Sequence, residues 1–102
     1  MKVAAIQHDI VWADRAANFA HLESLISLAA KNGATFVVLS EMFSTGFVVD
    51  DDSIAEDEGG PSSQFLVEMA TRYQLSIAGS CPERTIDDPR PFNSLVVASP
   101  DG

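Results

Sequence analysis

The sequence predicts an α/β fold in which short buried strands alternate with amphipathic helices. Residues 34–40 form a continuous apolar, β-branched run. Two other stretches, residues 19–30 and 65–73, repeat apolar residues at three- and four-residue steps. Along the chain these features follow the order strand, helix, strand, helix, strand, which is typical of parallel βαβ units with right-handed crossovers. With 102 residues, the chain can form one small domain.

The first half of the chain predicts two strands joined by one helix. Residues 2–7 are a short apolar run, as expected of a buried strand. Asp14 is a candidate N-cap for the following helix, and Asn32-Gly33 is a typical helix C-terminus. The apolar stripe of this helix consists of Phe19, Leu22, Leu25, Ile26, Ala29 and Ala30. The run at 34–40 then predicts a strand that is covered on both faces.

The second half predicts one more helix and two more strands. Pro61 suits the first turn of a helix, and it follows a polar, acidic loop that ends at Gly60. The stripe of this second helix consists of Phe65, Leu66, Met69, Ala70 and Tyr73. Residues 75–80 and 94–99 read as the third and fourth strands. Residues 82–92 hold three prolines and predict an exposed connection.

The last four residues, Ser-Pro-Asp-Gly at 99–102, have the composition of a turn. A turn that closes a hairpin requires a returning strand. We therefore expect the chain to stop at a hairpin and to leave an edge strand unpaired.

Composition argues against several classes of partner. Six basic and fifteen acidic residues give a net charge of −9, and no Lys/Arg cluster is present to bind nucleic acid. No apolar run is long enough to cross a membrane, and no signal peptide is evident, so no membrane partner is expected. The single cysteine, Cys81, excludes an internal disulfide and favours a reducing compartment, the cytoplasm.

Acidic residues crowd the segment from Asp50 to Glu58, and its main interpretation is a solvated loop. A calcium-binding loop is excluded, because Ala55 stands where such a loop needs glycine and Pro61 where it needs glutamate.

Glu41 is the candidate catalytic residue. It follows the apolar strand directly, and α/β folds bind their ligands at the carboxyl ends of strands. Next to Leu39, Met42 and Phe43, its carboxyl group is expected to be partly desolvated, which suits a group that takes up and releases protons. The alternative is a structural role, in which Glu41 caps a loop amide or pairs with an arginine.

Four segments, in this order, resemble the start of the nitrilase superfamily, the carbon–nitrogen hydrolases: KVAAIQHDIVW, GATFVVLSEMFSTGF, LSIAGSCPER and FNSLVVASPDG. The EMFSTGF stretch is similar to the omega-amidase-like branch. The resemblance covers essentially the whole chain. It implies that residues 1–102 are the N-terminal portion of a single domain, an α-β-β-α sandwich, with elements in βαβαββ order and a truncation at a hairpin.

The resemblance also implies a function. Members of the family use a Glu-Lys-Cys triad without metal or organic cofactor, and the omega-amidase-like branch hydrolyses the terminal amide of small ω-amides such as 2-oxoglutaramate. Glu41 matches the general base and acid, although Ser40 stands where the family usually has proline. The lysine and the cysteine are expected beyond Gly102, so the chain alone is expected to be inactive. A homo-oligomer is expected of the complete protein.

Residues around Glu41 have two interpretations. Phe43, Thr45 and Phe47 follow the base and either line the substrate pocket or pack the loop against the second helix. Cys81 does not match the nucleophile motif of the family, and we interpret it as an unreactive, buried or half-buried thiol.

The remaining polar candidates are expected to be structural. His8 and His21 lack the spacing of metal ligands, and Asn93 is expected to bond the backbone near a turn. A competing function is a catalytically incomplete module that associates through its exposed sheet face and edge.

Overall fold

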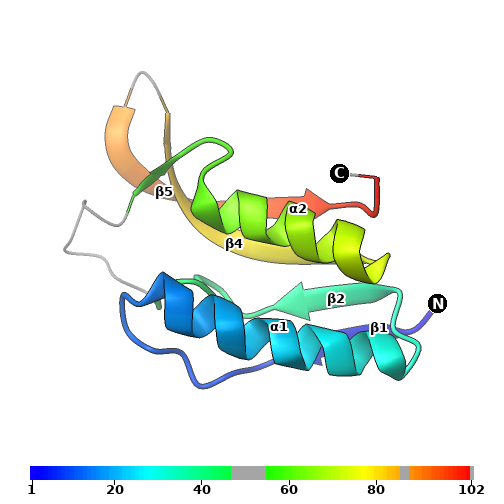
Figure 1. The fold of residues 1–102 in the computed structure, drawn as a ribbon. Helices are drawn as coiled ribbons and strands as arrows, with labels where there is room; N and C mark the ends of the chain where they lie inside the picture. The colour runs from blue at the N-terminus through cyan, green and yellow to red at the C-terminus, as the bar shows by residue number, and fades with distance from the viewer. Residues whose placement is uncertain (47–54, 86–87, 102) are drawn as a thin grey trace.

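The computed structural model describes residues 1–46, 55–85 and 88–101. In this part of the chain, two helices pack on one face of a five-stranded sheet (Figure 1). Strands β1 (Val3–Ile6), β2 (Phe36–Leu39) and β4 (Ser76–Thr85) are parallel neighbours in that order. Strand β5 (Asp88–Ala98) pairs with β4 in the antiparallel direction. The predicted βαβ units are confirmed. The β4–β5 hairpin is not the one that the turn at 99–102 was expected to close, and that expectation stays a prediction.

Helix α1 (Arg15–Lys31) begins and ends where the sequence indicates. The Asp14 side chain accepts a hydrogen bond from the Ala17 amide at 3.1 Å, which satisfies one of the free N–H groups of the first turn. At the other end Asn32 is the C-cap, and Gly33 adopts a φ of +88°, a left-handed conformation that glycine takes without strain.

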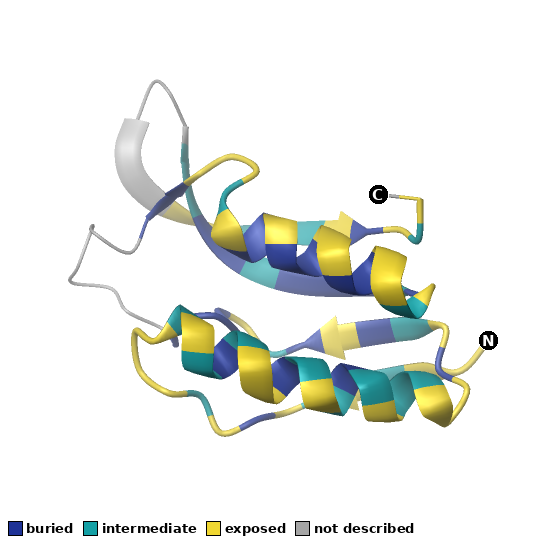
Figure 2. Cartoon of the chain, in the orientation of Figure 1, coloured by how far each residue is buried: buried dark blue, intermediate teal, exposed yellow. Residues whose placement is uncertain are grey.

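Helix α2 (Pro61–Tyr73) starts at the predicted proline and ends at Gln74. Its buried apolar residues are Phe65, Leu66, Met69 and Ala70, four of the five in the predicted stripe. Along both helices, exposed residues alternate with buried ones (Figure 2). Each helix therefore covers the sheet with one apolar face.

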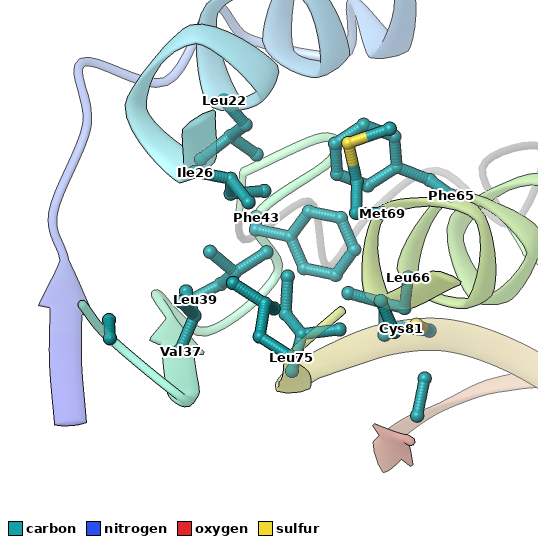
Figure 3. Close-up of a cluster of buried hydrophobic side chains, with 14 residues drawn as sticks. Leu22, Ile26, Val37, Leu39, Phe43, Phe65, Leu66, Met69, Leu75 and Cys81 are labelled. Carbon is teal, nitrogen blue, oxygen red and sulfur yellow. The ribbon is translucent and has the colours of Figure 1, made fainter. Parts of the chain in front are cut away.

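The hydrophobic core lies between the two helices and the sheet (Figure 3). Leu22 and Ile26 of α1 and Leu66 of α2 are fully buried, as is Val37 of β2. Phe43, from the loop after β2, enters this core, and its ring centroid lies 6.0 Å from that of Phe65. The loop that carries Glu41 is thus anchored in the centre of the molecule.

The opposite face of the sheet is open, so the prediction that β2 is covered on both faces is wrong. No helix of the described residues packs there. Large apolar side chains stand exposed on strands, among them Val3 at 56%, Val38 at 39%, Leu95 at 74% and Val97 at 58%. We call this surface the open face.

The prediction that residues 82–92 form an exposed connection between strands is also wrong. Residues 82–85 extend β4, and residues 88–92 begin β5, so that the two strands form one long hairpin. Two of the three prolines, Pro89 and Pro91, lie on β5, which pairs with a single strand among the described residues. Backbone positions that point away from that partner need no N–H group.

The acidic segment contains a short strand, β3 (Glu56–Asp57), which pairs with β4. Glu56 is buried, with 5% exposure, so the interpretation of this segment as a solvated loop fails at that residue. Residues 50–54 of the segment lie outside the described residues.

Candidate active site

Glu41 lies at the point where β2 ends, and its side chain is exposed. The next two residues, Met42 and Phe43, are 5% and 0% exposed and turn into the core. The expected desolvation of Glu41 by these neighbours is therefore wrong for this chain. Phe43 belongs to the core between the helices and the sheet, whereas Glu41 borders the open face beside Val38 and Leu95.

The backbone makes a sharp turn directly after Glu41. Met42 has a φ of +52°, in the left-handed region that few residues other than glycine adopt. Its amide donates a 2.6 Å hydrogen bond to the Ser80 hydroxyl of β4, and its carbonyl accepts one from the Gly46 amide at 2.8 Å. Unfavourable backbone conformations of this kind cluster at functional sites, where the surrounding structure holds them.

The Glu41 carboxylate has a partner from the far end of the chain. The Asn93 side-chain amide donates a hydrogen bond from Nδ2 to Glu41 Oε1 at 2.9 Å. Among the described residues, Glu41 bonds neither a loop amide nor an arginine, the two structural alternatives, and the Asn93 side chain bonds a carboxylate. Sequence reasoning missed this pair because 52 positions separate its members and only the β4–β5 hairpin brings them together.

Glu41 borders a hollow of about 310 Å³ in the sheet surface. Its lining consists of Val38, Leu39, Glu41, Ala78, Gly79, Ser80, Asn93 and Leu95. An apolar floor with a few polar groups at one side is typical of small-molecule sites, and this volume is at the small end of their range.

A larger hollow of about 850 Å³ lies along α2 and does not include Glu41. Its charged lining residues, Glu68 and Arg72, pair with each other, and Arg72 also bonds Glu23. No unpaired acid or base faces this second hollow from the described residues, so we place the candidate site at Glu41.

The predicted pocket residues have other positions. Phe43 is fully buried beside Phe19 and Phe65, so the packing alternative holds for it. Thr45 is also fully buried, and its hydroxyl donates to the Gly46 carbonyl at 2.9 Å. Neither residue lines the hollow at Glu41. Phe47 lies outside the described residues.

A buried polar cluster holds the loop after Glu41. The Ser62 hydroxyl lies 2.7 Å from the Ser44 hydroxyl and donates to Glu56 at 2.6 Å, while the Ser62 amide donates to the same carboxylate at 2.8 Å. Arg15 pairs with Glu56 at 2.6 Å. From α1, the Asn18 side chain donates to the Ser44 carbonyl at 2.8 Å. The loop therefore connects to both helices.

The one cysteine is unsuited to nucleophilic attack. Cys81 is fully buried, and this burial raises the pKa of its thiol to about 12. At neutral pH the group stays protonated, and the thiolate is the nucleophilic form. The interpretation of Cys81 as an unreactive thiol is consistent with this environment.

The part of the chain that the structure describes contains neither a metal-binding cluster nor a membrane-spanning helix. No group of three or more His, Cys, Asp or Glu side chains is arranged there to hold a metal ion. Neither helix in the described ranges is long and apolar enough to cross a bilayer.

A carboxylate at the carboxyl end of a parallel strand, beside a small hollow, is an arrangement found in α/β enzymes. The family model for carbon–nitrogen hydrolases matches residues 2–102. The chain therefore belongs to the carbon–nitrogen hydrolase family, as the four sequence segments indicated.

Relatives within this family are similar along most of the chain. A chloroplastic omega-amidase of Arabidopsis thaliana is 33% identical over 90% of the chain, and a nitrilase of Pyrococcus abyssi is 32% identical over all of it. The chain spans 26% and 40% of the lengths of these two proteins. The crystal structure of a CN-hydrolase superfamily protein from Xanthomonas campestris is 32% identical, with a TM-score of 0.83 over 94% of this chain and 35% of that one.

Proposed function

We propose that this chain supplies the general base and acid, Glu41, of an enzyme that hydrolyses amide bonds of small ω-amides. The observation that carries the proposal is the position of the Glu41 carboxylate, which stands at the end of β2, beside a hollow and in a hydrogen bond with Asn93. Family membership supplies the reaction class.

The proposed reaction uses Glu41 twice. First, the carboxylate takes the proton of a cysteine thiol, the sulfur bonds the amide carbon, and a lysine and a backbone amide stabilise the resulting oxyanion. Glu41 then returns the proton to the nitrogen, which leaves as ammonia when the C–N bond breaks. Water next attacks the thioester and loses a proton to Glu41. The C–S bond then breaks, Glu41 passes the proton to the sulfur, and the acid is released with the thiol restored. The lysine and cysteine of this scheme are not assigned to residues 1–102.

Two observations support small ω-amides as the substrate class. The EMFSTGF stretch is similar to the omega-amidase-like branch, and the Arabidopsis relative is named an omega-amidase. The Pyrococcus relative is named a nitrilase, so nitriles are the natural comparison substrates.

The test uses the enzyme expressed from the complete natural reading frame, with ammonia release as the assay. We expect Glu41→Gln to lower kcat by about 100-fold or more while the fold remains intact, because general acid–base groups contribute about 10²–10⁴-fold. Glu58→Gln is the control, since Glu58 is an exposed carboxylate in a turn and no role is proposed for it.

Near-normal turnover in Glu41→Gln would rule out the proposed role. Turnover of short nitriles but not of ω-amides by the unaltered enzyme would contradict the substrate class and leave Glu41 as the base.

A second candidate function is that of a module without activity of its own, which associates through the open face and the edge strands. The exposed Leu95 and Val97 side chains favour this candidate, since apolar surface of this kind marks interaction sites. The two candidates are compatible if the surface binds the rest of a complete enzyme.

A further inference from the structure

We propose that Asn93 is a positioning residue that holds the Glu41 carboxylate in its reactive orientation. This inference rests on the proposed role of Glu41 as general base. It assigns Asn93 to the site through its action on Glu41, without contact to the reacting atoms.

The hydrogen bond gives the two carboxylate oxygens of Glu41 different roles. Asn93 Nδ2 donates to Oε1 of Glu41 at 2.9 Å, so we assign the proton transfer to Oε2. Glu41 is exposed and follows the end of a strand, so burial does not hold its side chain in place. The bond orders the carboxylate before substrate binds. Without it, the carboxylate would become ordered only during the reaction, and the entropic cost would add to the activation free energy.

Glu41 is held from the same hairpin at two points. Ser80 of β4 accepts the 2.6 Å hydrogen bond of the Met42 amide and so fixes the backbone next to Glu41. Asn93 of β5 fixes the carboxylate. Ser80 pairs with Leu95 in the antiparallel ladder, and the next pair but one joins Pro82 to Asn93. The orientation of the base therefore depends on the register of β4 and β5.

An amide is chemically suited to this task. The Asn93 NH₂ group donates hydrogen bonds but does not titrate, so it neither competes for the proton nor neutralises the carboxylate. A lysine or arginine in its place would form an ion pair and make the carboxylate a weaker base. An aspartate would repel it.

The experiment compares variants of the complete natural reading frame by steady-state kinetics and thermal unfolding. We expect Asn93→Ala to lower kcat by about 10- to 100-fold, since misplacing a catalytic group by about 1 Å can cost that much. KM and the melting temperature should change little. Asn93→Gln keeps the amide on a longer arm and should recover part of the lost kcat. Ser94→Ala is the matched control, because Ser94 is the adjacent residue on the same strand and faces the other side of the sheet.

A KM increase with unchanged kcat would show that Asn93 contacts substrate, and would overturn the proposal. Unchanged kinetics in Asn93→Ala would do the same. If Asn93→Ala fails to fold, Asn93→Asp decides, because it keeps the size of the side chain and replaces the donor by a carboxylate. A normal kcat in that variant would also overturn the proposal. Loss of turnover in Glu41→Gln together with normal turnover in Asn93→Ala would refute this inference while leaving the proposed function standing.

Discussion

Gly79 of β4 leaves room for the Phe43 side chain, which anchors the loop that carries Glu41. A Cβ atom at this position would lie 2.7 Å from Cε1 of Phe43, closer than such atoms come in proteins. Gly79 therefore lets the Phe43 ring lie against β4, and the buried ring anchors the loop that begins at Glu41. The adjacent Ser80 bonds the Met42 amide. Two neighbouring residues of β4 thus determine where the loop leaves β2.

His8 is a residue whose environment the sequence did not reveal. It is 8% exposed, and neither ring nitrogen has a hydrogen-bond partner among the described residues. Burial lowers the pKa of His8 below its usual value, and the charge of nearby His21 acts in the same direction. The backbone of Phe43 and the carboxylate of Asp9 oppose this shift.

This lowered pKa predicts that acid destabilises the fold. In the unfolded chain His8 takes up a proton near pH 6.5, whereas the folded chain resists protonation until a lower pH. The free energy of unfolding should therefore decrease as the pH falls from about 6.5 towards the folded pKa of His8. Urea unfolding between pH 7.5 and 5 measures the effect.

The control variant for this experiment is His8→Leu, which replaces the titrating imidazole by an apolar side chain at the same buried position. Its free energy of unfolding should depend less on pH in this window. An equal pH dependence in both proteins would assign the effect to other groups.

At the scale of the elements, the helices follow from local rules. Apolar stripes, an N-cap at Asp14, a C-terminal glycine at position 33 and a proline at position 61 place the two helices within a residue or two of their observed bounds. These signals act within a few residues, so they can be interpreted without knowledge of the tertiary structure.

The N-cap of α1 provides a test at this scale. Asp14→Ala removes the acceptor of the Ala17 amide and should lower the free energy of unfolding by about 1 kcal/mol. Asp14→Ser keeps a capping oxygen and should retain most of the stability. Chemical denaturation of the three proteins measures the difference, and equal losses in the two variants would show that the cap contributes nothing.

The strands followed local rules less well. Residues 82–92 looked like a loop because of their three prolines, yet the described parts of this segment extend both strands of the hairpin. Pairing with a neighbouring strand outweighed the local preference of the chain, and strand preferences depend strongly on such context. The short strand β3 was missed for the same reason, since it exists through its pairing with β4.

At the scale of the whole molecule, the main feature is an unequal distribution of apolar surface. Both helices cover one side of the sheet, while Val3, Val38, Leu95 and Val97 remain exposed on strands. The candidate base stands beside this open face, with Leu95 lining its hollow. A partner bound to this face would exclude water from Glu41 and would create the desolvated environment that the sequence had suggested for it.

We expect the isolated chain to associate through this surface. Sedimentation velocity at increasing concentration should show species larger than the monomer, despite the net charge of −9. Val97→Lys, which places a charge on the open face, should reduce the association. Val67→Lys makes the same change on α2, where Val67 is 40% exposed, and should have little effect.

A chain that remains monomeric at high concentration would contradict this prediction. Equal effects of the two lysine variants would attribute the association to net charge instead of the open face.

The sequence by itself determined the order of the elements, the bounds of the helices, the family and the position of Glu41 at the end of a strand. These depend on patterns within a few residues or on motifs in fixed order. Only the tertiary structure decided that Glu41 is exposed, that Asn93 holds it, that Phe43 belongs to the core and that one face of the sheet is open. Burial and hydrogen bonding between distant residues depend on which strands become neighbours, and local sequence does not specify the contacts that such pairing creates.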